Sequence, residues 1–338
     1  MLTLCVSGNI VPMLNIIHGA NPENLFRAFN IPIPPEILDF STNTNILTWP
    51  DVSLNMQHLA SHYPDPECSR LRELIAEREH VPPSRILFTN GTNEAIFLLA
   101  GLFPENTAIL EPAYPEYARA FTNLHRVFSL EEALSFSQII IVNPNNPTGK
   151  YLHLAEFIRA HPQNIFIVDE AYIDFLLRKK PERLCDFPNV IILRSLTKIF
   201  HLSGARIGYV IAGDEIISAL KKRQPSWSVN AFAQELAAEF LGDEGFLRRT
   251  RDFYSRETPA FMNMLREAGC EVIDSDVHFF LVRVRDDEAV IRHLLTNGIA
   301  VRHTRNFAGL GGKYIRIAAR LPDDNRKFAD TVKNLVRV

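Results

Sequence analysis

Long apolar runs, an excess of basic charge and paired cysteines are all absent from this chain of 338 residues. The net charge of -3 at pH 7 gives no basic surface of the kind that binds nucleic acid, so we expect no nucleic-acid partner. The four cysteines, Cys5, Cys68, Cys185 and Cys270, stand too far apart for a disulfide framework or a metal motif. This spacing predicts no metal centre and favours a reducing, cytoplasmic location.

The first 17 residues are apolar, but they lack the basic start of a secretion signal. Asn9, Pro12 and Asn15 interrupt the stretch, so we expect neither a signal peptide nor a membrane anchor. Met13 is an alternative start of translation. Internal repeats and low-complexity tracts are also missing, which leaves an ordinary globular composition with 46% hydrophobic residues.

Short runs of branched apolar residues alternate with helical patterns through the first two thirds of the chain. Strands are predicted at residues 86–89, 107–111, 139–142, 165–168 and 209–212, and at the run that begins with Val190. Such alternation predicts an α/β fold with a mainly parallel sheet and helices on both faces. The last third predicts a smaller α+β unit, with strands at residues 271–273, 279–284, 300–303 and 314–317.

This pattern predicts three parts. Residues 46–245 form a large α/β domain, and residues 246–338 form a small C-terminal domain. Residues 1–45 are an N-terminal segment that packs with the small domain. We expect polar residues just past the predicted strand ends to lie together, because parallel sheets bind ligands at the carboxyl ends of their strands. These residues are Asn146, Asp169, Tyr172, Ser195 and Lys198.

Lys198 follows a buried run and precedes another, and an unpaired ammonium there is costly. A desolvated lysine loses its proton readily and can form a Schiff base, with Ser195 and Arg206 beside it for a phosphate. Ser195 and Lys198 also fit the S-x-x-K motif of serine nucleophiles, but its S-D-N and K-T-G partners are missing. A lysine that reaches solvent from the strand end is the third reading.

A strand, the turn Asn90-Gly91-Thr92 and an apolar helix follow one another near residue 90. This arrangement offers backbone N–H groups and the positive end of a helix dipole to a phosphate. It lacks the G-x-G-x-x-G spacing of dinucleotide sites.

Three motifs then occur in a fixed order: Asn-Pro-Thr-Gly, Asp-Glu-Ala-Tyr, and Ser-x-x-Lys with an arginine eight residues later. In this order and spacing the chain resembles the fold-type I pyridoxal-phosphate enzymes of the aspartate aminotransferase superfamily. The resemblance runs from about His18 to Arg320. Within the superfamily, His-Gly-x-Asn, Asp-Phe-Ser-x-Asn-x-Asn and Pro-x-Trp-Ser-Val-Asn are most similar to the threonine-phosphate decarboxylases of cobalamin biosynthesis. The histidinol-phosphate aminotransferases are near relatives.

The resemblance implies pyridoxal 5'-phosphate as cofactor and assigns three catalytic residues. Lys198 holds the cofactor and moves protons, Asp169 keeps the ring nitrogen protonated, and Tyr172 donates to the ring oxygen. The implied cofactor-binding set is Tyr63, Gly91, Thr92, Asn93, Tyr114, Asn146, Asp169, Tyr172, Ser195, Lys198 and Arg206. Tyr63 belongs to the neighbouring subunit, so a homodimer with shared active sites is implied.

The implied substrate is a small phosphorylated amino acid. The residues implied to bind it are His18, Asn43, Asn146, Arg302 and Arg316. If Arg302, Arg316 and His18 hold a phosphate, the substrate carboxylate is free to turn out of the ring plane and leave as CO2. If they hold the carboxylate, a proton is lost and the enzyme is an aminotransferase. The sequence leaves both reactions open, together with a pyridoxal-binding regulator, which we expect to need an additional DNA-binding domain.

Overall fold

The computed structural model describes residues 19, 21–49 and 52–336. Its largest element is a seven-stranded sheet in the order β2-β8-β7-β6-β5-β3-β4. Five neighbouring strands are parallel, and β8 runs antiparallel to both β2 and β7. The strand bounds are β2 Ile86–Thr89, β3 Thr107–Leu110, β4 Leu124–Val127, β5 Gln138–Val142, β6 Ile165–Asp169, β7 Val190–Ser195 and β8 Gly208–Ile211. The predicted α/β fold with a mainly parallel sheet is confirmed, and β4 is an edge strand that the sequence patterns missed.

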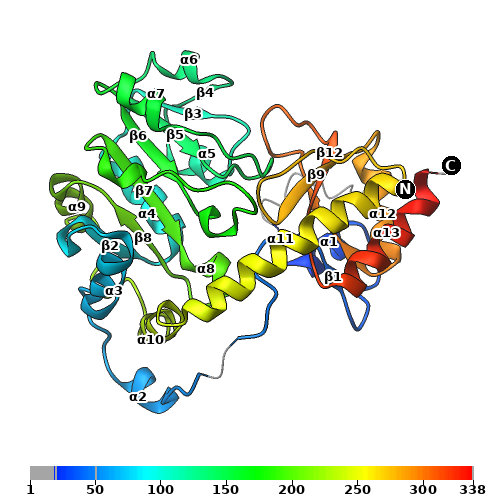
Figure 1. Cartoon of the computed structure of the whole chain (residues 1–338), viewed down its shortest axis with the longest axis horizontal. Helices are drawn as coiled ribbons and strands as arrows, with labels where there is room; N and C mark the ends of the chain where they lie inside the picture. Colours follow the sequence, from blue (N-terminus) through cyan, green and yellow to red (C-terminus); the bar gives the residue numbers. More distant parts are fainter. Residues whose placement is uncertain (1–18, 20, 50–51, 337–338) are drawn as a thin grey trace, which may run out of the picture.

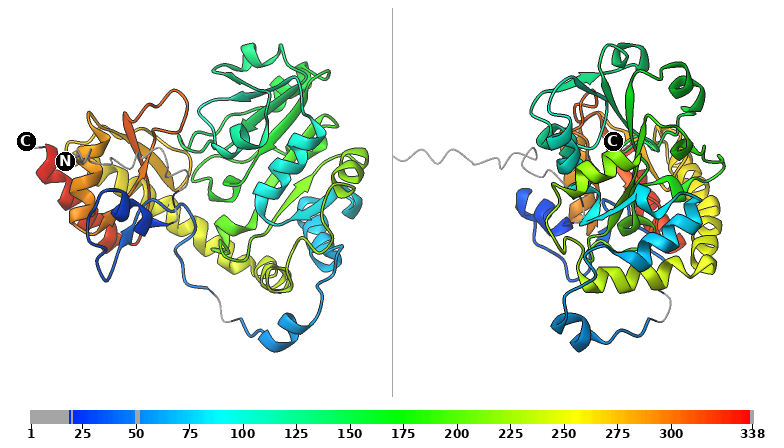
Figure 2. Two further views of the ribbon diagram at one scale, coloured as in Figure 1. Left: turned by 180° about the vertical axis from the view of Figure 1, so that it is seen from behind. Right: turned by 90° about the vertical axis from the view of Figure 1, so that its left-hand side faces the viewer.

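Both faces of this sheet are buried, which explains its continuous apolar strands. Alternate residues of one strand enter two separate cores, as Ile140 and Ile141 of β5 do. Figure 2 shows α4 lying across one face of the sheet. The helices of this part are α3 Ser69–Glu79, α4 Gly91–Leu102, α5 Glu116–Ala120, α6 Leu130–Ala133, α7 Ala155–Ala160, α8 Leu196–Ile199 and α9 Asp214–Lys221, with the 3-10 turns η2 Pro83–Arg85, η3 Ile173–Phe175 and η4 Leu184–Asp186.

A second, antiparallel sheet in the order β11-β12-β9 lies beside the first (Figure 1). Its strands are β9 Phe279–Arg283, β11 Arg302–His303 and β12 Tyr314–Ala318, and a separate parallel pair joins β1 Leu38–Asp39 to β10 Ile299–Ala300. The flanking helices are α1 Pro22–Ala28, α12 Asp287–Thr296 and α13 Pro322–Val336. The long helix α11 Glu244–Glu267 runs from beside α8 to this second sheet, and α10 Ala231–Leu241 precedes it.

Two predictions in this region were wrong. Residues 271–273 form no strand and contribute one isolated bridge, from Val272 to Val282. The strand predicted at residues 300–303 is broken at Val301 into β10 and β11, which belong to different sheets. The break matters for the site, because it frees Arg302 to pair with Arg316 on β12.

The segment that precedes α3 extends away from both sheets (Figure 1) and carries the short helix α2 Met56–Ser61. Tyr63 follows it with 82% of its surface exposed and packs on Trp227 with 4.8 Å between ring centroids. No helix among the described residues combines the length and the apolar character needed to cross a membrane.

Candidate active site

The carboxyl ends of β5, β6 and β7 meet at one edge of the large sheet, and a cavity of about 120 Å3 opens there. Every predicted cofactor residue except Gly91 and Tyr63 lines this cavity. The lining residues are Thr92, Asn93, Ile96, Tyr114, Val142, Asn146, Asp169, Ala171, Tyr172, Ser195, Thr197, Lys198 and Arg206. Residues that are more than 100 positions apart in the chain therefore converge on one small polar space.

Lys198 lies near the end of α8, the short helix that β7 leads into. Burial lowers the pKa of its ammonium to about 8, and the nearby guanidiniums of Arg316 and Arg206 act in the same direction. Asp169 opposes this shift. Lys198 is therefore much closer to its neutral, nucleophilic form at physiological pH than a solvent-exposed lysine is.

Asp169 ends β6 and is buried at the base of the cavity. Its Oδ2 accepts a hydrogen bond of 2.9 Å from the Tyr117 hydroxyl, and its Oδ1 accepts one of 3.1 Å from the backbone N–H of Ala171. Burial raises the pKa of this carboxyl, while the two donors pull it down. A carboxylate held this way is suited to bind a cationic N–H group inside the cavity.

The sequence patterns missed Tyr117, which is fully buried on α5. Its position three residues after Tyr114 was the available indication, since residues three apart lie on one face of a helical turn. Tyr114 itself donates to Asn93 Oδ1 at 3.4 Å, and burial raises the pKa of its hydroxyl to about 12. Tyr172 is buried beside the cavity as well, and its pKa is raised for the same reason.

An anion cradle surrounds the start of α4. The helix begins at Gly91 with φ +70, and no side chain caps its first N–H groups. A Cβ on Gly91 would lie 2.5 Å from Arg206 Nη2, so only glycine lets the guanidinium approach the helix start this closely. The Ser195 and Thr197 hydroxyls, 2.7 Å apart, add further donors to the cavity. Helix N–H groups, hydroxyls and a guanidinium are the donor set that a phosphate monoester needs.

Arg302 and Arg316 face each other across β11 and β12. Both are nearly buried, with 3% and 4% of their surfaces exposed. Arg302 donates to Asn306 Oδ1 at 2.7 Å. Burial lowers the pKa of Arg302 to about 9, and the charge of Arg316 adds to the shift. Two buried cations that repel each other favour an anion between or beside them.

Arg316 links this pair to the cofactor cavity. It donates from Nη1 to Asn146 Oδ1 and from Nη2 to the Ser41 carbonyl, both at 2.6 Å. Its Nε and the Nδ2 of Asn43 are buried, and neither has an acceptor among the described residues. These two donors are suited to bind an acceptor on a ligand, because an unsatisfied buried polar group is costly.

Two predicted residues remain apart from this arrangement. His18 lies outside the described residues, although its neighbour Gly19 sits against Ser41 and Arg302. Tyr63 lies on the projecting segment and does not line the cavity of its own chain. Its predicted contact with a second subunit stays a prediction. Among the described residues, no cluster of three or more His, Cys, Asp or Glu side chains could hold a metal ion.

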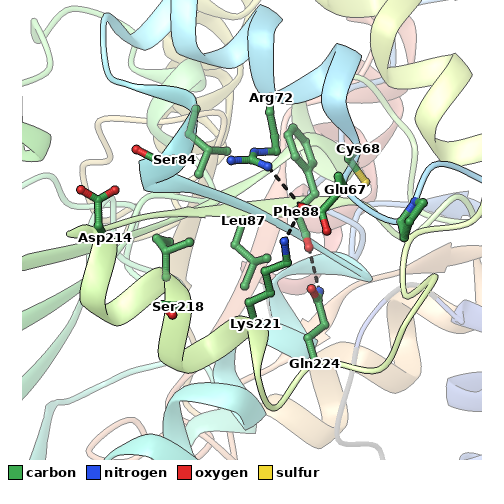
Figure 3. Close-up of a pocket in the computed structure, with 13 residues that line it drawn as sticks. Glu67, Cys68, Arg72, Ser84, Leu87, Phe88, Asp214, Ser218, Lys221 and Gln224 are labelled. Atoms are coloured by element: carbon green, nitrogen blue, oxygen red, sulfur yellow. Dashed lines mark hydrogen bonds and ion pairs between the residues drawn. The ribbon is translucent and has the colours of Figure 1, made fainter.

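A larger cavity of about 420 Å3 lies beside β2, α3 and α9 (Figure 3). Three of its charged groups already contact one another, since Glu67 pairs with Arg72 at 3.3 Å and also with Lys221. Gln224 at its edge donates to the Phe88 carbonyl at 2.8 Å. None of the buried donors or acceptors without a partner among the described side chains lines this cavity, so the chemistry is expected at the strand ends.

Known proteins resemble this chain over most of its length. The chain is 31% identical to the threonine-phosphate decarboxylase of Salmonella typhimurium, covering 96% of this chain and 98% of that one. It is 30% identical to the histidinol-phosphate aminotransferase of Caldicellulosiruptor saccharolyticus, covering 82% and 84%. The solved structure of the histidinol-phosphate aminotransferase from Sinorhizobium meliloti in complex with pyridoxal-5'-phosphate shares the fold, with a TM-score of 0.82, 21% identity and 99% of each chain covered.

The family model described as aminotransferase class I and II matches residues 38–332. The matched region contains both sheets and, apart from His18, all the predicted site residues. The resemblance noted from the motifs is thereby confirmed, and so is the cofactor that it implies. The chain belongs to the aminotransferase class I and II family, and its cofactor is pyridoxal 5'-phosphate.

Proposed function

We propose that this enzyme decarboxylates L-threonine O-3-phosphate to (R)-1-amino-2-propanol phosphate, a reaction of cobalamin biosynthesis. The observation that carries the proposal is the buried pair Arg302 and Arg316, which lies apart from the anion cradle at Gly91. A substrate phosphate carries more charge than a carboxylate and matches two guanidiniums better. The Salmonella relative named for this reaction supports the choice.

Roles for the cavity residues follow from their chemistry. When bound, pyridoxal phosphate supplies a conjugated ring that accepts the electron pair of whichever Cα bond stands perpendicular to it. Asp169 would hold the proton on the ring nitrogen, and Tyr172 and Asn146 would be the partners of the ring oxygen. Lys198 attaches the cofactor and later delivers a proton to Cα from its Nζ. Arg206, Ser195 and the start of α4 bind the cofactor phosphate.

Substrate orientation then decides the reaction. Arg302, Arg316 and Asn43, together with His18, hold the substrate phosphate, and the carboxylate turns perpendicular to the ring. The bond from Cα to the carboxylate breaks, CO2 leaves, and Cα takes a proton. A transaminase of the histidinol-phosphate type is the second candidate, and the 30% identity to such an enzyme favours it. There the same arginines would hold the carboxylate in the plane of the ring.

We further propose that two copies share their active sites. Tyr63 is 82% exposed after the projecting segment and packs on Trp227, which is itself 49% exposed, so the two rings form an exposed aromatic pair. In a homodimer this tyrosine reaches the cofactor phosphate of the other subunit. The division into residues 1–45, 46–245 and 246–338 and the cytoplasmic location also belong to this proposal.

The deciding experiment measures CO2 release from L-threonine O-3-phosphate by the purified, cofactor-loaded protein. We expect release without any added keto acid, and none from the Lys198→Ala variant. The same protein is then tested with histidinol phosphate and 2-oxoglutarate. Rapid transfer of the amino group with no CO2 from threonine phosphate would establish the aminotransferase instead.

A further inference from the structure

A single short segment, residues 41–46, contacts both the substrate arginine and the cofactor lysine. At its start the Ser41 carbonyl accepts the 2.6 Å hydrogen bond from Arg316 Nη2. Near its end the backbone N–H of Asn45 donates to the Lys198 carbonyl at 2.9 Å. The segment therefore joins the two sides of the site through the backbone, by a route that does not pass through the cavity.

The side chain of Asn45 also binds the end of α8. Its Nδ2 donates to the Ile199 carbonyl at 2.9 Å and to Thr250 Oγ1 on α11 at 2.8 Å. Carbonyls at the end of a helix have no partner within the helix, and α8 has only four residues. The completely buried Asn45 supplies partners for two of these carbonyls, those of Lys198 and Ile199. The Lys198 carbonyl also accepts a longer, 3.3 Å hydrogen bond from the His201 N–H, so Asn45 is the shorter of its two backbone contacts and the one that comes from outside α8 and its C-terminal turn.

Two aromatic side chains hold the segment as well, one in its middle and one at its last residue. Asn43 accepts a 3.0 Å hydrogen bond at its carbonyl from His278 Nε2, and Ile46 donates to the Tyr254 hydroxyl at 3.0 Å. Burial lowers the pKa of His278 to about 3, so its ring is neutral and donates from Nε2. These hydrogen bonds make the segment a continuous physical connection between Arg316 and the end of α8.

We propose that residues 41–46 couple the binding of the substrate's anionic group at Arg316 to the placement of Lys198, and that Asn45 is the positioning residue. The inference rests on the proposed function only in assigning an anion to Arg316. An anion at Arg316 competes for the guanidinium that now holds the Ser41 carbonyl. The segment moves in response, and Asn45 carries this movement to the end of α8.

A second connection exists and has to be separated from this one. Arg316 Nη1 donates to Asn146 Oδ1, and Asn146 lines the cofactor cavity directly. Both connections predict that an anion changes the surroundings of Lys198, and the charge of the anion acts on Lys198 through space as well. Only the coupling through residues 41–46 predicts that Asn45 is required for this change.

The test uses the cofactor-loaded enzyme with inorganic phosphate as the probe. Calorimetry measures phosphate affinity, and the cofactor absorbance at constant pH reports the surroundings of Lys198. In the parent enzyme phosphate should bind and change the absorbance, and Arg316→Ala should remove both effects. Asn45→Ala should keep the affinity within about threefold and retain only the part of the absorbance change that the charge of the anion causes through space, because coupling and binding are separate free energies.

Thr250→Ala is the matched control, because it removes the other partner of Asn45 Nδ2 and leaves the hydrogen bonds to α8 in place. It should retain the coupling. An undiminished absorbance change in Asn45→Ala would overturn the proposal, as would equal losses in Asn45→Ala and Thr250→Ala. A change abolished by Asn146→Ala but not by Asn45→Ala would assign the coupling to the other connection. If phosphate does not bind the parent enzyme at Arg316, the anion site of the proposed function fails as well.

Amide hydrogen exchange in the parent enzyme and in Arg316→Ala tests the same coupling without any Asn45 variant. The amide of Asn45 donates to the Lys198 carbonyl, so its exchange rate reports that hydrogen bond directly. Phosphate should change this rate in the parent enzyme and leave it unchanged in Arg316→Ala. An identical rate with and without bound phosphate in the parent would contradict the coupling.

Discussion

Replacing Arg316 with alanine tests the proposed substrate site most directly. The guanidinium is 4% exposed and donates two hydrogen bonds of 2.6 Å, while its Nε faces no acceptor among the described residues. Loss of a desolvated guanidinium from a bound anion costs roughly 2–5 kcal/mol. At about 1.4 kcal/mol per tenfold change, kcat/KM should fall by about 30-fold to about 5,000-fold. Cofactor absorbance should persist, since the proposed function assigns the cofactor phosphate to Arg206.

The assay compares L-threonine O-3-phosphate with plain threonine. If Arg316 holds the phosphate, the variant should lose far more kcat/KM on the phosphorylated substrate than on threonine. Equal losses on both substrates would refute this reasoning and place the carboxylate at Arg316. Arg283→Ala is the control, because this arginine lies in the same sheet but pairs with Glu271 at the exposed surface. The Arg283→Ala variant should keep kcat/KM unchanged for both substrates, since exposed ion pairs contribute little to stability.

Three further predictions concern the cofactor. In the cofactor-free enzyme, the rate at which pyridoxal phosphate attaches to Lys198 should rise with pH around a midpoint near 8, because only the neutral amine attacks and its pKa is lowered to about 8; a midpoint near that of free lysine would contradict the burial argument. Gly91→Ala should weaken cofactor affinity, measured by equilibrium dialysis, at least about tenfold, because alanine is strained at this left-handed backbone and its Cβ would clash with the Arg206 guanidinium. Gly101→Ala on the same helix places its Cβ in open space and should leave this affinity unchanged. Tyr117→Phe removes a donor from Asp169 and should lower kcat about 5-fold to about 100-fold while preserving the melting temperature within a few degrees; an unchanged kcat would exclude a role for the hydroxyl.

The sequence predicted much of the large sheet because its strands carry a strong local pattern. Runs such as Ile139 to Val142 are buried on both faces, so each is apolar throughout and bounded by polar turns. The strand ends could also be placed, and with them Asp169, Ser195 and Lys198, because the parallel arrangement brings these ends together. The candidate-site residues that directly follow a strand in the chain could therefore be placed together from the sequence.

Other features depend on contacts that no local pattern records. Arg302 faces Arg316 only because the chain breaks at Val301 and enters a different sheet. Tyr117 is one tyrosine among eight, and only the packing of α5 brings it to Asp169. Asn45 reads as a turn residue, since asparagine favours turns, yet it is completely buried against α8. In each case tertiary pairing between distant segments decides the role.

The charges of the site explain why these distant segments must meet. The guanidiniums of Arg316 and Arg206 lower the pKa of Lys198, and that of Arg316 also lowers the pKa of Arg302. Asp169 is the acidic side chain that lines the cofactor cavity. Concentrating cations in a buried space is unfavourable unless anions neutralise them. In the proposed function, a cofactor phosphate at Arg206 and a substrate anion at Arg302 and Arg316 would supply that neutralisation at two separate places. Binding either anion should therefore raise the pKa of Lys198, because the incoming negative charge favours its ammonium form.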